Sequence, residues 1–231
     1  MPASTPVTVH FFNYRRTRDK WWAFTQMQFA HAPLGRVPGL LFYKLMGSGA
    51  GTGFSLRPDW STYCLLCVWE NEAAAAAFMD TDPQYAAFAA RAEITTHHFE
   101  PVRKKGTWDR QDPFVTGPPL EAHERLAVLT RAGIRTRRLY EFWQHVPESS
   151  RAILNRPGLL FSKGVGELPV VQQATVSIWE NREAMLDFAY RDKTHREIIQ
   201  KTHRRGWYHE EMFVEFRVRE MGGAVSSKIF G

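Results

Sequence analysis

The feature that most constrains the fold of this chain is an internal repeat. Residues 38–44 (PGLLFYK) return as residues 157–163 (PGLLFSK), which is an offset of 157 − 38 = 119. Further along, residues 69–71 (WEN) return as residues 179–181, which is an offset of 179 − 69 = 110. The difference falls in one loop, which is long and glycine-rich in the first copy and short in the second. Because surface loops tolerate insertions, the chain is expected to contain two copies of one folding unit.

Each copy shows the same expected order of elements, βαββαβ. In the first copy the elements are expected at residues 7–13, 19–31, from 40, up to 69, from 72 and at 94–103; in the second they are expected at 126–133, 138–154, from 159, up to 179, from 182 and at 212–219. This order belongs to the ferredoxin-like unit, whose four-stranded sheet leaves one face bare. Two copies can bury these faces against each other. The predicted fold class is therefore α+β, with two tandem ferredoxin-like units that form a pseudo-dimeric α/β barrel.

The expected domain boundaries follow from the repeat and from the turn-forming residues between its copies. An N-terminal unit spans residues 1–104, and a linker rich in proline spans residues 105–122. A C-terminal unit, which is expected to hold the cofactor site, spans residues 123–221. Residues 222–231, which are rich in glycine and serine, are expected to form a flexible tail.

Composition and charge narrow the classes of function. No apolar run approaches the roughly 18 residues that span a membrane, and the N-terminus lacks a signal-peptide pattern, so we expect a cytoplasmic protein. The formal net charge of +6 favours solubility and would also favour contact with an anionic membrane surface. The basic residues are scattered and match no nucleic-acid-binding motif, so nucleic acid is not an expected partner.

The two cysteines form a C-x-x-C pattern, Cys64 and Cys67, which is found in redox and zinc sites. Here the pattern lies in an apolar segment that is expected to be a buried strand. Side chains three residues apart on a strand point to opposite faces. We therefore expect two separate core thiols.

Positions where the repeat breaks are candidate functional positions, because duplicated units share their scaffold residues. With the offset of 110, Tyr85 in the first copy corresponds to His195 in the second. His195, Ile198 and Ile199 fall at i, i+3 and i+4 and form one inward stripe of an expected helix. The positive end of the helix dipole disfavours the imidazolium form, and a neutral imidazole on an apolar face is suited to bind a haem iron. A core histidine with a backbone hydrogen bond fits the same spacing, so the residues alone leave both interpretations open.

A second break in the repeat is Arg131, which stands where the offset of 119 places Phe12. An arginine between apolar residues of a strand needs a partner. A haem propionate, bound oxygen and a carboxylate such as Glu167 suit it equally well. On another strand, Gln173 shares one face with Thr175 and Ser177, which predicts a polar wall.

Along nearly its whole length the chain resembles the spheroidene monooxygenase family. In the second half the resemblance rests on residues 129–132 (LTRA), 142–143 (FW), 146–147 (VP), 164–169 (GVGELP), 173–179 (QATVSIW), His195, 207–208 (WY) and 210–211 (EE). In the first half it rests on residues 38–39 (PG), 47–49 (GSG) and 53–54 (GF).

The resemblance implies a haem b protein that uses O2, and electrons from a donor such as ferredoxin, to oxygenate an apolar small molecule of the carotenoid type. It also implies kinship with chlorite dismutases and dye-decolourising peroxidases. In those proteins the axial histidine comes from a helix of the C-terminal unit, and an arginine near the distal side comes from a strand. On that kinship His195 is the expected iron ligand and Arg131 is an expected catalytic residue on the distal side. Gln173, from the polar wall, is the other expected catalytic residue. The remaining expected contacts of the haem are Arg135, Glu167, Ile198 and Ile199.

Two other functions stay open from the sequence. The chain could be a haem enzyme of another reaction class, such as a dehydratase or a nitrogen-chemistry enzyme. It could also be a cofactor-free barrel, either a monooxygenase that uses its substrate's own reducing power or a binding module. Peripheral membrane association and a homo-oligomer are compatible with each of these functions.

Overall fold

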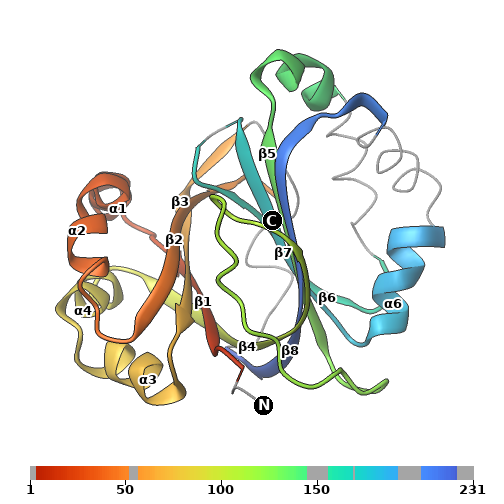
Figure 1. The fold of residues 1–231 in the computed structure, drawn as a ribbon. Helices are drawn as coiled ribbons and strands as arrows, with labels where there is room; N and C mark the ends of the chain where they lie inside the picture. The colour runs from red at the N-terminus through yellow and green to blue at the C-terminus, as the bar shows by residue number, and fades with distance from the viewer. Residues whose placement is uncertain (1–3, 52–56, 145–155, 169, 192–203, 223–231) are drawn as a thin grey trace.

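Strands from both halves of the chain form one closed barrel (Figure 1). A computed structural model describes residues 4–51, 57–144, 156–168, 170–191 and 204–222. The strands of this part of the chain follow one another around the barrel in the order β1-β3-β2-β6-β7-β5-β8-β4. The predicted fold class is confirmed: two ferredoxin-like units share one pseudo-dimeric α/β barrel.

The N-terminal unit follows the expected element order. Its elements are β1 (Val7–Asn13), α1 (Thr17–Phe29), α2 (His31–Leu34), β2 (Leu40–Gly49), β3 (Pro58–Trp69), α3 (Glu72–Thr81), α4 (Pro83–Ala89) and β4 (Glu93–Gly106). The first helix, which was expected at residues 19–31, is divided into α1 and α2. The Asp82 side chain caps α4 by accepting hydrogen bonds from the backbone N–H groups of Gln84 and Tyr85.

The C-terminal unit repeats this order. Its elements are β5 (Leu126–Ile134), η1 (Thr136–Arg138), β6 (Leu159–Gly166), β7 (Gln172–Trp179), α6 (Arg182–Leu186), the π-helical segment η2 (Asp187–Arg191) and β8 (Tyr208–Met221). Residues 139–144 are also helical and open the helix that was expected at 138–154.

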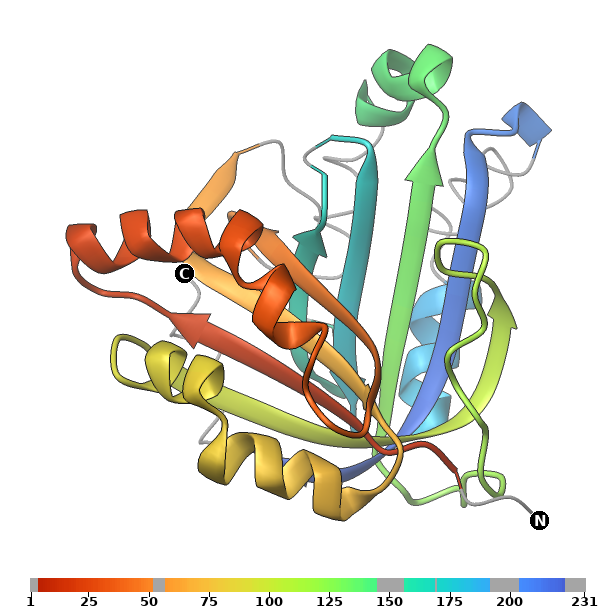
Figure 2. The same ribbon diagram turned by 60° about the vertical axis from the view of Figure 1, so that its left-hand side comes forward.

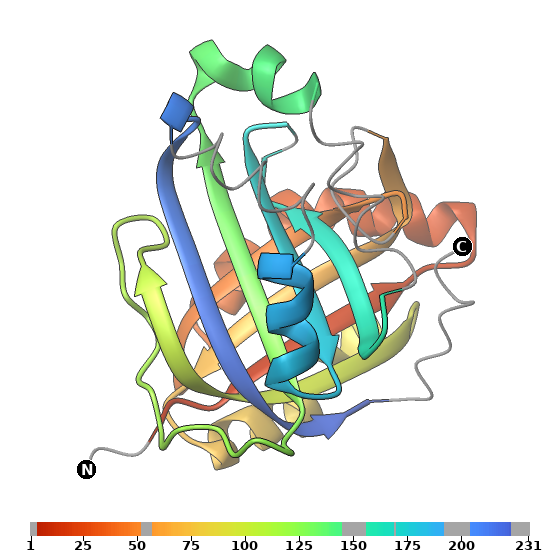
Figure 3. The ribbon, with the colours of Figure 1, turned by 90° about the vertical axis from the view of Figure 1, so that its right-hand side faces the viewer.

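The two units meet along two seams of different length. Along the long seam β4 pairs with β8, from His97 opposite Met221 to Gly106 opposite Met212. Along the short seam β2 pairs with β6 through Gly47 and Ser48. Inside the barrel, alternate residues of the strands from both units form one apolar core. The described helices lie outside the barrel, with α1–α4 against the N-terminal sheet and α6 against the C-terminal sheet (Figures 2 and 3).

The two cysteines show how the strands separate inner and outer faces. Cys64 belongs to the core inside the barrel, whereas Cys67 belongs to the cluster between the N-terminal sheet and its helices. Both thiols are free and buried, and burial raises the pKa of each above its usual value. The expectation of two separate core thiols is confirmed.

The two units are most alike at the turns that precede their second strands, β2 and β6. Gly39 and Gly158 both have a left-handed backbone, with φ of 73° and 77°. A Cβ atom built on either glycine would lie 2.5 Å from the Cβ of Ala74 or Ala184, respectively. The ends of β3 and β7 are held to these turns. The backbone N–H of Glu70 donates to the carbonyl of Gly39, and that of Glu180 donates to the carbonyl of Gly158. Glycine is therefore required at both positions, which explains the repeated Pro-Gly.

We expect Gly39→Ala to lower the free energy of unfolding by about 1–3 kcal/mol, because it adds both backbone strain and a clash. Urea denaturation measures the change. The matched control is Gly47→Ala, since a Cβ at Gly47 would have no atom within 4 Å. Adding Ala74→Gly to Gly39→Ala removes the second Cβ atom of the clash. The double variant should therefore recover the part of the lost stability that the clash causes. Equal stability of Gly39→Ala and Gly47→Ala would contradict this explanation.

Among the described residues, no helix combines the length and the apolar character that crossing a bilayer requires.

Candidate functional site

The outer face of the C-terminal sheet carries smaller side chains than the outer face of the N-terminal sheet. The strand pairings identify which residues of the two sheets are equivalent. Phe12 opposite Tyr63 in the first unit corresponds to Ala132 opposite Gln173 in the second. Four further equivalences on β5, β6 and β7 also remove bulk, since His10, Tyr43, Leu45 and Leu65 correspond in turn to Thr130, Ser162, Gly164 and Thr175. At these positions the C-terminal sheet therefore contributes much less side-chain volume to the layer between sheet and helices.

The N-terminal unit shows how this layer is filled when the side chains are large. Tyr85, in the first turn of α4, packs onto the outer face of the sheet. Its ring centroid lies 5.3 Å from that of His10 and 5.1 Å from that of Phe78. His195, the counterpart of Tyr85 in the repeat, lies outside the described residues, as do Ile198 and Ile199.

Gln173 lies on the outer face, as its alternation with Ala174 requires. Its side chain is buried and stands beside Ser177 and Thr175, so the expected polar wall exists. Ala174, Val176 and Ile178 point the other way and belong to the core of the barrel. Gln173 therefore faces the layer between the C-terminal sheet and its helices.

Arg131 lies on the opposite face and points into the barrel. It pairs with Ala174, as Phe11 pairs with Cys64, so its counterpart is Phe11 rather than Phe12. The offset between the first strands of the two units is 131 − 11 = 120, and the expected alignment was wrong by one residue. A one-residue shift moves a side chain to the other face of a sheet. The two expected catalytic residues, Arg131 and Gln173, are therefore not brought together.

The partner of Arg131 is a pair of carboxylates that the sequence did not single out. One guanidinium nitrogen donates to Glu210 on β8, and the other donates to Asp109 in the linker at 3.2 Å. The side chain is 1% exposed, and its guanidinium carbon lies 5.7 Å from the centre of the Trp108 ring. A carboxylate is among the partners that the sequence predicted for Arg131, and here two carboxylates pair with it.

Glu167 joins the same network through Lys44 and Trp108. It pairs with Lys44 on β2 at 2.6 Å and accepts a hydrogen bond from the indole N–H of Trp108 at 2.9 Å. Lys44 also pairs with Asp109. We call Lys44, Asp109, Arg131, Glu167 and Glu210 the ionic network. It links β2, β5, β8 and the residue that follows β6 to the linker at one end of the barrel.

The linker enters this network through a strained turn. Asp109 and Arg110 have φ of 53° and 63°, and Trp108 and Gln111 exchange backbone hydrogen bonds across them. Two left-handed residues in a two-residue hairpin loop make a type I′ turn, which normally contains asparagine or glycine. Here Glu210 accepts hydrogen bonds from the backbone N–H groups of both residues, at 3.2 Å and 2.7 Å. The carboxylate holds the turn in its unfavourable conformation.

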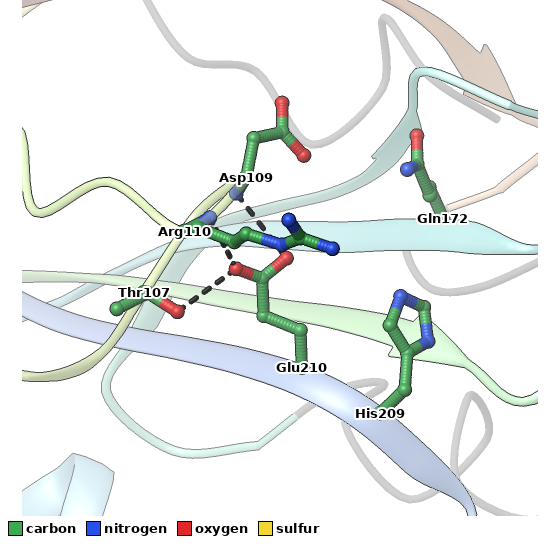
Figure 4. Close-up of a pocket in the computed structure, with 6 residues that line it drawn as sticks. All are labelled: Thr107, Asp109, Arg110, Gln172, His209 and Glu210. Atoms are coloured by element: carbon green, nitrogen blue, oxygen red, sulfur yellow. Dashed lines mark hydrogen bonds between the residues drawn. The ribbon is translucent and has the colours of Figure 1, made fainter.

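A hollow of about 520 Å³ opens beside this turn, and Figure 4 shows the side chains around it. Glu210 points toward Thr107 and the backbone of the turn, and His209 and Gln172 stand on the other side of the hollow. Gly133 makes room for the His209 ring, since a Cβ there would lie 2.5 Å from the ring's Cε1 atom.

The protonation state of Glu210 limits what this hollow can do. Burial acts to raise the pKa of Glu210. Hydrogen bonds from Arg110 N, Thr107 Oγ1 and Arg131 outweigh burial and lower the pKa to about 2. A carboxylate with this pKa is a weak base near neutral pH. The ionic network is therefore suited to closing the barrel end rather than to proton transfer.

We expect Glu210→Gln to lower the free energy of unfolding at pH 7 by about 2–3 kcal/mol, because it removes a charged acceptor from four donors. A depressed pKa in the folded state stabilises the fold above the unfolded value, about 4.3, and this contribution is lost as pH falls toward 2. Urea denaturation between pH 7 and 3 should therefore show a smaller acid destabilisation in the variant.

The control for this experiment is Glu211→Gln, at a neighbouring carboxylate. Glu211 is 42% exposed at its side chain and lies 3.8 Å from its partner Lys105, so its loss should change stability by less than about 1 kcal/mol. If both variants kept the wild-type pH profile, Glu210 would not be the group that holds the turn.

Arg135 is the last of the expected site residues. It is exposed at the end of β5, where its Nε donates to the backbone carbonyl of Tyr208 at 3.1 Å. Sequence reasoning missed Lys44, Asp109, Trp108 and Glu210, although the resemblance included residues 210–211. Apart from that resemblance, the sequence signal for them was the need of Arg131 for an unidentified partner.

Comparison with known proteins places the chain in a family. No protein-family model matches it. The spheroidene monooxygenase of Rhodobacter capsulatus is 32% identical over 224 residues, which cover 96% of this chain and 93% of the relative. The chain belongs to the spheroidene monooxygenase family. The spheroidene monooxygenase of Rubrivivax gelatinosus agrees, with 30% identity over 91% of this chain and 81% of the relative. Family membership confirms the expected resemblance and makes the protein an oxidoreductase of the monooxygenase class.

Solved structures support the fold of this family member. A crystal structure of aldoxime dehydratase superimposes with a TM-score of 0.63 over 93% of this chain and 82% of that chain, at 11% identity. A second aldoxime dehydratase, in complex with butyraldoxime, gives a TM-score of 0.60 over 93% of this chain and 80% of that chain, also at 11% identity. At this identity the likeness shows a shared architecture.

Proposed function

We propose that the protein is a haem-dependent monooxygenase that inserts one oxygen atom from O2 into a carotenoid-like apolar molecule. Membership in the spheroidene monooxygenase family carries this proposal, because the relatives are named for an apolar substrate and for this reaction. The balanced reaction takes O2, two electrons and two protons, and it releases water with the oxygenated product. Its electrons must come from an external donor, for which a ferredoxin-type protein is suited.

The residues of the C-terminal unit fit a haem on the outer face of its sheet. A flat macrocycle between sheet and helices needs side-chain volume to be removed, and Ala132, Gly164 and Thr175 remove it relative to the N-terminal unit. The repeat assigns His195 to the position from which Tyr85 faces the first sheet. We therefore propose His195 as the iron ligand, with Ile198 and Ile199 as its apolar neighbours. When bound, the haem would supply the activation of O2.

The described side chains would surround that chemistry in different roles. Gln173 is buried on the outer face, and its amide can donate a hydrogen bond to a polar atom held there. Arg135 carries a positive charge at the exposed end of β5, where a haem carboxylate could be paired. Arg131 and Glu167 lie in the ionic network, so we assign them to closing the barrel end rather than to contact with haem.

Haem binding can be tested without turnover. We expect His195→Ala to lower haem occupancy, and Tyr85→Phe at the equivalent position to leave it unchanged. Gly164→Leu installs the residue that the N-terminal unit has as Leu45, and overpacking should weaken haem binding about tenfold or more. Ser177→Cys is the volume-matched control on the same face. Absorption spectra and haem titrations measure the outcome, and full occupancy in Gly164→Leu would contradict a haem at this sheet.

The reaction class needs its own experiment. We expect turnover to require both O2 and a reductant, and the product to carry label from ¹⁸O2. Gln173→Leu should slow turnover by about 10–100-fold at unchanged haem occupancy, if its amide donor acts on the reacting group. Turnover without O2 and without consumption of electrons would instead indicate a dehydratase.

A further inference from the structure

An exposed aromatic patch lies on the N-terminal unit, away from the outer face of the C-terminal sheet. Trp21 and Phe24 on α1 are 67% and 46% exposed, and Trp60 at the start of β3 is 55% exposed. Their rings are contiguous, since the centroid of Phe24 lies 6.1 Å from that of Trp21 and 5.5 Å from that of Trp60. The contact between Phe24 and Trp60 joins α1 to the start of β3. We call Trp21, Phe24 and Trp60 the aromatic patch.

The sequence of α1 explains why these rings stay outside. Trp21 and Phe24 are three residues apart and share one helix face, while Ala23 and the half-buried Trp22 face the sheet. The helix is therefore aromatic on both faces. Only one of them is used by the N-terminal core, so the other is not explained by folding of this chain.

Basic side chains surround the aromatic patch. Arg15, Arg16 and Arg18 are exposed before and within the first turn of α1, and Lys20 is half-buried on the flank of the patch. Arg57 is exposed just before β3. The acidic groups beside them are Asp19, which is close to Arg18, and Glu93, which pairs with Arg15. Asp59 next to Trp60 pairs with Lys163. The surroundings are therefore net positive.

We propose that the aromatic patch and its basic surroundings bind the protein to an anionic lipid bilayer. Tryptophan rings prefer the boundary between headgroups and acyl chains, and lysine and arginine side chains are attracted to anionic headgroups. The proposal rests on the proposed function in one respect, since an apolar substrate of carotenoid type would be dissolved in the same bilayer.

The size of the patch favours a bilayer over a second copy of the chain. Three partly exposed aromatic residues offer on the order of 300–400 Å² of surface. A stable dimer buries about 800 Å² on each partner, with charged residues depleted from its centre. A second copy would also bring like charges together around the patch.

The test uses the full-length holoenzyme and vesicles of two compositions, phosphatidylcholine alone and phosphatidylcholine with phosphatidylglycerol. Flotation measures the bound fraction, and the tryptophan emission maximum reports insertion of the rings. We expect the wild-type protein to bind the anionic vesicles, with weaker binding at high salt. Trp21→Ser with Trp60→Ser should weaken binding about tenfold or more. Arg18→Glu with Lys20→Glu should remove the preference for phosphatidylglycerol.

The matched control is Tyr140→Ser, which removes an 80% exposed aromatic residue from the other unit and should bind like wild type. Equal binding of wild type and the double tryptophan variant would overturn the proposal. So would a concentration-dependent dimer, seen by light scattering, that these substitutions abolish while vesicles stay unbound. Haem occupancy and turnover of a detergent-solubilised substrate are measured in parallel. If the wild-type protein neither binds haem nor turns over this substrate, the proposed function is contradicted, while the vesicle result still stands.

Discussion

The closed barrel depends on the pairing of one buried positive charge. Arg131 lies inside an apolar barrel, where an unpaired guanidinium would be strongly unfavourable. Glu210 and Asp109 compensate that charge, and through Asp109 the compensation extends to Lys44 and Glu167. The five side chains come from three strands, from the residue that follows β6 and from the linker. The linker turn can therefore keep its left-handed residues only while both units of the barrel are in place.

The C-terminal sheet divides its two faces between two tasks. Its inner face completes an apolar core to which both units contribute, through residues such as Leu129, Phe161 and Ile178. On its outer face, by contrast, the large residues of the first unit give way to Ala132, Gly164 and other small side chains. Duplication makes this contrast visible, because the first unit shows what the same sheet looks like when it only packs against helices.

The architecture could be predicted from the sequence because the two copies agree best at positions where the backbone conformation admits few residue types. The repeated Pro-Gly marks a left-handed residue in contact with a helix, and few other residues fit there. The same reasoning recognised that Arg131 needs a partner but could not identify it. Glu210 is 79 residues away and Asp109 is 22 residues away, and only barrel closure brings them together. The alignment of Arg131 with Phe12 was wrong by one residue. The offset of 119 was taken from the Pro-Gly segments before β2 and β6, whereas the preceding strands β1 and β5 are offset by 120. The assignment of His195 stays a prediction.

The opposite orientation of neighbouring residues on β7 has a practical consequence for protein engineering. Gln173 and Thr175 can be varied while Ala174 and Val176, which belong to the core, stay as they are. A library restricted to the outer positions Thr130, Gln173 and Thr175 would therefore sample new binding properties while the inner-face core and the outer cluster around Trp179 are kept. Selection on such a library would separate the requirements of the reaction from those of folding.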